Sequence, residues 1–286
     1  MPKSALKKVA LVYRIDSDKA RAQAFGLAKE LQAKGLSVYS HPDQKLPKPS
    51  EPYSPSKKID LVIVLGGDGT YLEAVRMTEG APIPFLGVNL GSLGFLTAHR
   101  AEDLEEVVAL TLNGKMKTEE RTLLEVKVVK ENKTKNHWIA LNDFVLERGS
   151  ASHLIHLNLE IGGQPVSDIK ADGMIVASPT GSTAYNLAAG GPILHPFVDA
   201  VVATPICPHS LTSRPFIFPD DQVVSMTLMG EHPKAMITVD GQKMAELGIG
   251  DQVCVKKSKL KHVMLRKPDH NYFMLLKEKL KFGERA

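Results

Sequence analysis

The sequence is poor in several residue types, and each shortage excludes a class of protein. It has only Cys207 and Cys254 among 286 residues, too few for a disulfide framework or a zinc cluster. No apolar run approaches the roughly 20 residues of a membrane span. The lysines between Met1 and Lys8 are not followed by the apolar stretch of a secretory signal. These shortages predict a cytoplasmic protein that has no contact with membranes.

Net charge and aromatic content are also low. The formal net charge is +4, aromatic residues make up 6% of the chain, and lysine and arginine are spread along it. No basic stripe with interleaved aromatic residues is present, which argues against nucleic-acid binding. The histidines and carboxylates do not repeat at metal-ligand spacing, so the ligands of any metal stay unknown. A modest positive excess instead suits anionic small substrates.

The densest pattern in the chain predicts a strand, a glycine-rich turn and a helix over residues 61–77. The apolar run Leu61 to Leu65 is typical of a strand buried on both faces, and residues 71–77 carry apolar side chains at helical spacing. Between them lies Gly-Gly-Asp-Gly-Thr, whose glycines and following helix N-terminus suit a phosphate. The turn lacks the Gly-Lys-[Ser/Thr] ending of a P-loop. Taken alone, it also fits an ordinary turn capped by Thr70.

The first hundred residues alternate strands with helices and predict a doubly wound parallel sheet. Ligands of such sheets bind beyond the carboxyl ends of the strands, where the stretches 66–70 and 89–94 both fall. The expected strands cover 8–13, 36–39, 61–65 and 82–89, and the expected helices cover 17–34 and 71–77.

The pattern changes after about Ala101. A helix is expected over 102–114, and from Arg121 onward short runs alternate apolar and polar residues, as in 124–130 and 156–163. This texture predicts an antiparallel, sandwich-like β domain. We therefore expect an α/β domain at 1–100, joined by the tail 263–286, and a β-rich domain at 101–262.

Two further polar motifs fall in the β-rich half. Residues 172–192 lead from an apolar strand into Pro-Thr-Gly-Ser-Thr and a short helix, where hydroxyls and free N–H groups form a polar pocket. A capped helix with structural glycines is the alternative. Asn142 and Asp143 stand side by side and can hydrogen-bond two hydroxyls, such as a ribose diol. The same pair also occurs in ordinary turns.

In their order and spacing, these motifs resemble the NAD kinase family. The turn motif alone is shared with diacylglycerol-type lipid kinases and 6-phosphofructokinases, whereas its combination with Pro-Thr-Gly-Ser-Thr-Ala-Tyr is more specific. The resemblance implies transfer of the ATP γ-phosphoryl group, with a divalent metal such as Mg²⁺, to the 2′-hydroxyl of the adenosine ribose of NAD. It also implies a homo-oligomer, a dimer or a tetramer. The stretches that carry it are 66–70, 89–96, 142–143, 172–192, 204–211 and 240–242.

The resemblance also implies roles for single residues. Asp68 corresponds to the proton acceptor of the reaction. Cys207 stands where a small residue is common, so we expect it to pack rather than to act as a nucleophile. Asn186 and Ala188 stand where many relatives have serine. The implied ATP and phosphate contacts are Gly66, Gly67, Gly69 and Thr70. The implied NAD contacts are Asp68, Gly69, Asn142, Asp143, His153, Lys170, Asp172, Thr183, Ala184, Tyr185, Asn186, Leu187, Ala188, Cys207 and Gln242.

Two other functions stay open from the residues. One is phosphorylation of a lipid or sugar hydroxyl, against which Asn142, Asp143 and Gln242 argue. The other is a dinucleotide sensor without catalysis, against which the intact Asp68 argues. We expect the NAD pocket to lie between the domains and the subunits to associate through the β domain, because edges of antiparallel sheets favour pairing.

Overall fold

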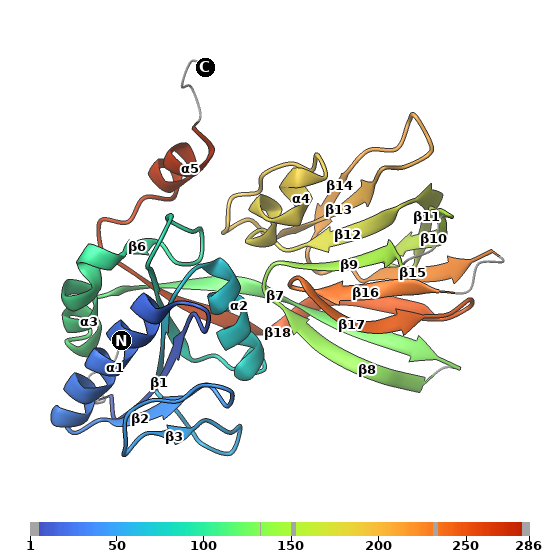
Figure 1. The fold of residues 1–286 in the computed structure, drawn as a ribbon. Coiled ribbons are helices and arrows are strands. Elements are labelled where there is room, and N and C mark those ends of the chain that lie inside the picture. Colours follow the sequence, from blue (N-terminus) through green and yellow to red (C-terminus); the bar gives the residue numbers. More distant parts are fainter. Residues whose placement is uncertain (1–5, 132, 150–152, 231–233, 282–286) are drawn as a thin grey trace. The chain divides into compact units, whose positions relative to one another are not determined.

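The chain folds into two compact units. The computed structural model describes residues 6–131, 133–149, 153–230 and 234–281. The first unit runs up to Glu120 and resumes at His262, and the second comprises Arg121–Lys261. The strands β7 (Lys117–Lys130) and β18 (Gln252–Arg266) each begin in one unit and end in the other (Figure 1). This division differs from the boundary expected near residue 100, because α3 (Leu104–Leu112) buries side chains in the core of the first unit.

A parallel sheet forms the centre of the first unit, as the sequence predicts. Its strands follow the order β3-β2-β1-β4-β5, and each adjacent pair is parallel. Every residue of β4 is buried. The register places Leu65 beside Tyr13 and Val88, so the carboxyl ends of three strands meet at one edge of the sheet. The strands are β1 (Lys8–Tyr13), β2 (Ser37–Ser40), β3 (Glu51–Pro52), β4 (Leu61–Leu65), β5 (Pro84–Asn89) and β6 (His99–Arg100).

Capping side chains and a glycine set the ends of helices in this unit. The Ser17 side chain accepts a hydrogen bond from the Ala20 N–H and starts α1. Gly35 follows its end with a φ of 82°, which glycine adopts without strain. The sequence reading missed α5, which starts where the Asn271 side chain caps two N–H groups. The helices are α1 (Asp18–Ala33), α2 (Asp68–Met77), the short 3₁₀ helix η1 (Ala101–Asp103), α3 and α5 (Tyr272–Leu280).

A buried aromatic cluster anchors α2 to the sheet. Tyr71, on the first turn of α2, lies with its hydroxyl 2.8 Å from Nε2 of His262 on β18. Its ring packs against Phe85 on β5 with the centroids 5.4 Å apart. Gly87 makes room for this ring, since a Cβ there would lie 2.9 Å from it. The N-terminus of α2, which carries Asp68, is therefore fixed relative to the strands.

Antiparallel sheets form the second unit, again as the sequence predicts. One sheet has the order β14-β13-β12-β9-β16-β17. The strands β11-β10-β15-β18 are paired in that order, with β7 and β8 paired as a hairpin, and they belong to the same sheet as the parallel strands because Val263 and Met264 of β18 pair with β5. Alternate apolar residues, such as Phe144 and Leu157, enter one core cluster. The remaining strands are β8 (Lys133–Ala140), β9 (Asp143–Arg148), β10 (Ile155–Ile161), β11 (Gln164–Ala171), β12 (Gly173–Ala177), β13 (Ala200–Ile206), β14 (Phe216–Pro219), β15 (Val224–Met229), β16 (Ala235–Val239) and β17 (Gln242–Leu247).

A second apolar cluster lies on the other face of β9, β12 and β13. It contains Val145, Ile175 and Val202, together with Leu194 from the segment that follows β12. That segment contains the 3₁₀ helix η2 (Gly181–Thr183) and the short helix α4 (Tyr185–Ala188) (Figure 1). The segment therefore covers the sheet face on which Asp143 also lies, two residues from Val145.

Candidate active site

The loop over residues 93–97 holds the carboxylate of Asp68. Oδ2 accepts the N–H of Phe95 at 2.8 Å. Oδ1 accepts the N–H of Leu96 at 3.1 Å, the N–H of Thr97 at 3.0 Å and the Thr97 hydroxyl at 2.9 Å. Asp68 is also the first residue of α2, where the helix dipole favours a negative charge. The carboxylate is partly exposed and has a fixed orientation.

Gly94 permits this close contact. A Cβ at position 94 would lie 2.0 Å from Oδ1 of Asp68 and 2.5 Å from the Thr97 hydroxyl. Asn89, at the end of β5, donates its side-chain amide to that hydroxyl at 2.9 Å and accepts the N–H of Gly91. The stretch 89–97 is thus built around the Asp68 carboxylate.

The glycines of the turn fall into two kinds. A Cβ on Gly66 would lie 2.6 Å from the hydroxyl oxygen of Thr70, so Gly66 is needed for the packing of the turn itself. A Cβ on Gly67 or Gly69 would meet nothing within 4 Å, and neither residue has a positive φ. The fold of the described residues therefore does not require glycine at these two positions.

In the second unit, Asp240 organises the backbone around Asn142 and Asp143. Its carboxylate accepts the N–H of Leu141 and of Asn142 at 2.8 Å, and that of Asp143 at 3.1 Å. Asp240 itself has a φ of 46°, followed by Gly241 at 77°, so this turn is in the left-handed region. The sequence reading used Asp240 only as part of a motif and did not assign it a role.

Asp143 is buried beside this second carboxylate. Only 4% of Asp143 is exposed. Burial, and next the negative charge of Asp240, raise the pKa of Asp143 to about 7, and a hydrogen bond from the Tyr185 backbone opposes the rise. The carboxyl group therefore changes its protonation near neutral pH.

The segment after β12 packs closely on Asn142. The Ser178 N–H donates to the Asn142 carbonyl at 2.9 Å, and the Ser178 hydroxyl donates to that of Leu141 at 2.6 Å. A Cβ on Gly181 would lie 2.0 Å from the Asn142 carbonyl oxygen. Two motifs that are far apart in the sequence are thereby brought together.

The hydrogen-bonding groups of the Asn186 side chain are bonded to other residues of the protein. The side chain is fully buried, and its amide donates to the carbonyls of Ser182 at 2.9 Å and Pro192 at 3.0 Å. Its oxygen accepts the hydroxyl of Thr204 at 2.7 Å. These contacts hold the segment on the sheet, and an NAD contact of Asn186 stays a prediction.

Tyr185 is 44% exposed and lies within electrostatic reach of several of the other predicted site residues. Partial burial raises the pKa of the Tyr185 phenol, and so do the acidic side chains of Glu147, Cys207, Asp143 and Asp172. The pairing of β12 with β9 and β13 explains this grouping, because Gly173 lies opposite both Glu147 and Ile206. The Asp172 carboxylate pairs with the Nε of Arg148 at 3.0 Å.

The remaining predicted residues lie mostly at the surface of the second unit. Lys170 is exposed on β11, and its carbonyl accepts the N–H of His209 at 2.9 Å. His153 and Gln242 are exposed, as are Cys207 and Ala188. Thr183, Ala184 and Leu187 are partly buried. Their contacts with NAD stay predictions.

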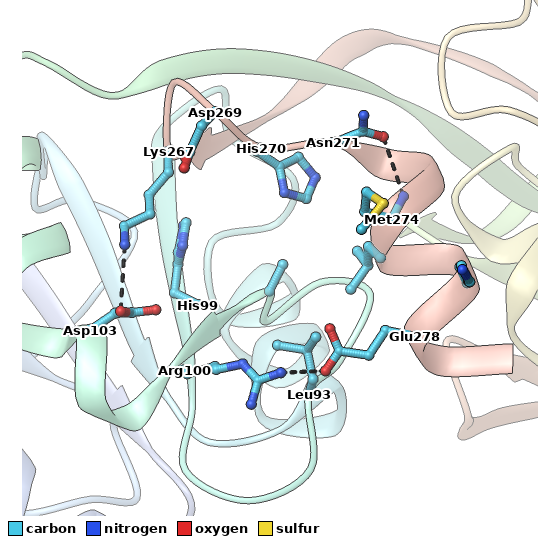
Figure 2. A pocket seen from close by; sticks show the side chains of 13 residues that line it. Leu93, His99, Arg100, Asp103, Lys267, Asp269, His270, Asn271, Met274 and Glu278 are labelled. Atoms are coloured by element: carbon cyan, nitrogen blue, oxygen red, sulfur yellow. Dashed lines mark hydrogen bonds and ion pairs between the residues drawn. The ribbon is translucent and has the colours of Figure 1, made fainter. Parts of the chain in front are cut away.

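A pocket of about 520 Å³ lies in the first unit beside the loop that holds Asp68. Figure 2 shows it between that loop, β6 and α5, with Arg100 paired to Glu278 and Lys267 paired to Asp103. Nε2 of His99, in its wall, donates to the Leu265 carbonyl at 3.1 Å, and burial lowers the pKa of His99 to about 4. These pairings satisfy several of the charges that line the pocket.

Two kinds of site are absent from the part of the chain that the structure describes. No group of three or more histidine, cysteine, aspartate or glutamate side chains is arranged to hold a metal ion there. None of the described helices is both long and apolar enough to cross a membrane.

Taken together, the fold and these groups define a class of protein. A parallel sheet ends in a glycine turn in which the Asp68 carboxylate has a fixed orientation. An antiparallel β unit carries the Asn142 amide and the Asp143 carboxyl group beside the segment that follows β12. This combination defines a nucleotide-binding phosphotransferase built from an α/β and a β unit.

Comparisons with known proteins give the family. The family model of the ATP-NAD kinase N-terminal domain matches residues 53–116, and that of the ATP-NAD kinase C-terminal domain matches residues 141–267. The chain belongs to the ATP-NAD kinase family, and it is an enzyme that uses ATP to phosphorylate NAD.

Individual relatives agree with this assignment. The NAD kinase of Bdellovibrio bacteriovorus is 50% identical over 280 residues, which cover 97% of this chain and 92% of the relative. The NAD kinase of Aquifex aeolicus is 39% identical over 227 residues, covering 79% and 83%. The structure of yeast NADH kinase complexed with NADH matches with a TM-score of 0.92 at 27% identity, covering 99% of this chain and 90% of that one. An Archaeoglobus fulgidus NAD kinase in complex with ATP shares the fold, with a TM-score of 0.75 at 23% identity over 96% of this chain and 98% of that one.

Proposed function

We propose that the chain transfers the γ-phosphoryl group of ATP to the 2′-hydroxyl of the adenosine ribose of NAD, with Asp68 as the proton acceptor. The observation that carries this proposal is the hydrogen bonding of the Asp68 carboxylate. Oδ1 accepts three donors, whereas the contact of Oδ2 is with the Phe95 N–H. Because a carboxylate oxygen has two lone pairs, Oδ2 retains the capacity to accept a ribose hydroxyl. A positioned base of this kind contributes about 10²- to 10⁴-fold in rate.

We propose that Gly67 and Gly69 leave space for the ATP phosphates. The support is that no described part of the protein fills the space beside their Cα atoms. If so, Gly69→Ala raises the KM for ATP several-fold and leaves the melting temperature unchanged, because alanine suits the first turn of α2. Gly66→Ala is the contrasting variant, since its Cβ meets Thr70 and lowers stability. An unchanged KM in Gly69→Ala would contradict a phosphate role.

We propose that the second unit binds NAD through Asn142 and Asp143. The backbone N–H groups of this pair are held by Asp240, which leaves the Asn142 amide, in a partly exposed position, to read a ribose or an amide. His153, Lys170 and Gln242 are exposed on the same unit and are proposed as further contacts. Substitution of each to alanine, with NAD affinity measured by calorimetry, tests these assignments one by one.

We propose that a divalent cation such as Mg²⁺ enters with ATP. The described residues offer no cluster of ligands that would hold it alone, and Mg²⁺ commonly takes substrate phosphates with few protein ligands. Treatment with a chelator should abolish activity, and added Mg²⁺ should restore it. Because the described part of the chain forms no metal cage, the chelator should leave the melting temperature of the free enzyme unchanged.

We propose a homo-oligomer in which copies associate through the β unit. The support is β14, which pairs with β13 at the end of its sheet and exposes Phe216 and Ile217. Leu211, on the segment before β14, is 93% exposed. Light scattering should therefore give a dimer or a tetramer, and Ile217→Lys should shift it toward monomer. A fully active monomer of the wild-type chain would contradict the proposal.

We also propose a cytoplasmic location, which the two free cysteines support because they suit a reducing compartment. Fractionation of the cells that produce the protein tests it.

The direct test of the function is an assay of the purified chain with ATP, Mg²⁺ and NAD, followed by enzymatic detection of NADP. We expect NADP and ADP in equal amounts. A matched panel with sugar and lipid alcohols in place of NAD should give no product. NAD binding without turnover would instead indicate a dinucleotide sensor.

A further inference from the structure

The buried end of β18 contacts the same loop that holds Asp68. Arg266 is the last residue of that strand and is 2% exposed. Its Nη1 donates to the Leu96 carbonyl at 3.0 Å, and its Nη2 donates to the Phe95 carbonyl at 2.7 Å. The planar guanidinium thus spans two consecutive carbonyls of one loop, a geometry that lysine does not reproduce.

Those two carbonyls belong to the peptide groups that hold Asp68 from the other side. The Phe95 carbonyl shares its peptide group with the Leu96 N–H, and the Leu96 carbonyl shares its group with the Thr97 N–H. Both N–H groups donate to Oδ1 of Asp68, at 3.1 and 3.0 Å. Two peptide groups therefore lie between a positive guanidinium and a negative carboxylate, and hydrogen bonds in such chains strengthen one another.

We propose that Arg266 is a positioning residue for catalysis, acting on Asp68 through these two peptide groups. The proposal rests on the proposed role of Asp68 as proton acceptor. By fixing Oδ1, the guanidinium determines where Oδ2 points, and so the orientation in which a ribose hydroxyl can be deprotonated. An error of about 1 Å in such positioning costs about 100-fold in rate. Arg266 lies behind the loop and touches neither substrate in this scheme, so its loss should lower kcat rather than raise KM.

Glu119 provides the means to test this without breaking the fold. Its carboxylate is buried and lies 3.9 Å from Nε of Arg266. Lys117 Nζ also lies 3.7 Å from the Glu119 carboxylate, but removing Arg266 alone would still take one partner from a buried charge, which is destabilising. The informative variant is therefore Glu119→Gln/Arg266→Met, which removes both charges and keeps the side-chain volumes close. Glu119→Gln alone is the matched control for kcat, because it keeps the guanidinium and both of its carbonyl contacts. Its melting temperature is measured as well, because it also removes one charge of the buried pair.

Kinetics with both substrates varied, together with thermal melting, should separate the two roles. We expect kcat of Glu119→Gln to stay within about 3-fold of wild type. We expect kcat of the double variant to fall about 10- to 100-fold, because a misplacement of about 1 Å at the reacting group costs about 100-fold. The KM for ATP and NAD should change little in both. In the Glu119→Gln background, Arg266→Lys should restore part of the rate because it keeps the charge without the planar fork.

A folded double variant with the kcat of the control would overturn the proposal. So would a loss of kcat that is matched by equal changes in both KM values, since that would indicate a distorted fold. If the double variant does not fold, the lysine variant carries the test, and a control-like kcat overturns the proposal there. Asp68→Asn, run in parallel, keeps the two proposals distinguishable. Activity in Asp68→Asn would refute the base assignment, whereas an inactive Asp68→Asn beside a fully active double variant would refute only the role of Arg266.

Discussion

Asp68 and Asp143 are both carboxyl groups at proposed substrate sites, yet their surroundings are opposite. Asp68 is partly exposed and receives donors from three N–H groups and a hydroxyl. Asp143 is buried, and the neighbouring carboxylate of Asp240 takes the backbone N–H groups of the local strand start, including its own. Burial, and next the negative charge of Asp240, raise the pKa of Asp143 to about 7.

The difference depends on which carboxylate accepts hydrogen bonds from the backbone N–H groups. In the first unit, the loop over 93–97 directs its N–H groups at the residue proposed to react. In the second unit, the corresponding N–H groups donate to Asp240, a residue that orders the backbone of the site. We infer that the first arrangement favours chemistry and the second favours recognition, because Asp143 can donate or accept a hydrogen bond depending on its protonation.

The largest expected effect is on Asp68. Asp68→Asn keeps the shape and much of the hydrogen bonding but cannot accept a proton at neutral pH. We expect kcat to fall about 10²- to 10⁴-fold with NAD affinity nearly unchanged. Steady-state kinetics and calorimetry measure the two quantities. A variant with a near wild-type rate would reduce Asp68 to a turn residue.

The next largest effect on kcat is expected from Gly94, in the loop that holds Asp68. Gly94→Ala places a Cβ where Oδ1 of Asp68 now lies, 2.0 Å away, so the loop or the carboxylate must move. We expect a loss of about 100-fold in kcat. Gly91→Ala is the matched control, because its Cβ meets its nearest neighbour at an ordinary 3.8 Å. Equal kinetics for the two variants would show that the close contact does not matter for turnover.

A substitution of Asn142 tests the proposed role of the second unit in recognising NAD. Asn142→Ala should weaken NAD binding more than ATP binding, by about 1–3 kcal/mol, as for a buried hydrogen bond left unmade. Calorimetric titration of each substrate provides the measurement. If both affinities drop equally, Asn142 has a structural role and the recognition account loses its main support.

The smallest effect is a pH-dependent change in stability at Asp143. Its folded-state pKa, about 7, lies above the ordinary 3.8, so between these values the folded state holds a proton that the unfolded chain has released. The wild type therefore loses stability as the pH rises through this window. Asp143→Asn has no such titration, so its melting temperature relative to wild type should rise between pH 4 and pH 7. The expected gain is about a few degrees, and a difference independent of pH would contradict the burial argument.

Local pattern predicted the buried strands and the glycine turn, because neighbouring residues determine both features. The role of Asp68, which the family resemblance implies, stays a prediction. Local pattern did not predict the surroundings of Asp68, since the hydrogen bonds from Thr97, the close approach of Gly94 and the contact of Arg266 with the Leu96 carbonyl depend on strand register and on the end of β18. The helix α5 was missed because its short run after a lysine-rich strand has no strong period.

Asn186 and Asp240 are two further residues whose structural roles the local sequence does not reveal. The resemblance implies an NAD contact for Asn186 but gives no sign that its side chain is fully buried and bonded to Ser182, Pro192 and Thr204. The sequence pattern gives Asp240 no role beyond its place in a motif, although its carboxylate orders the backbone of Asn142 from 98 positions away in the sequence. Roles that are carried by such long-range hydrogen bonds leave little trace in local sequence.

The division of labour between the two units is tested most directly by one measurement, the single-turnover rate of NADP formation at saturating ATP and NAD. For Asn142→Ala we predict the wild-type rate once NAD is saturating, because only binding is impaired. For Asp68→Asn we predict a rate that stays orders of magnitude lower at any NAD concentration. The account would be contradicted if saturating NAD restored Asp68→Asn, or if Asn142→Ala stayed slow when fully bound.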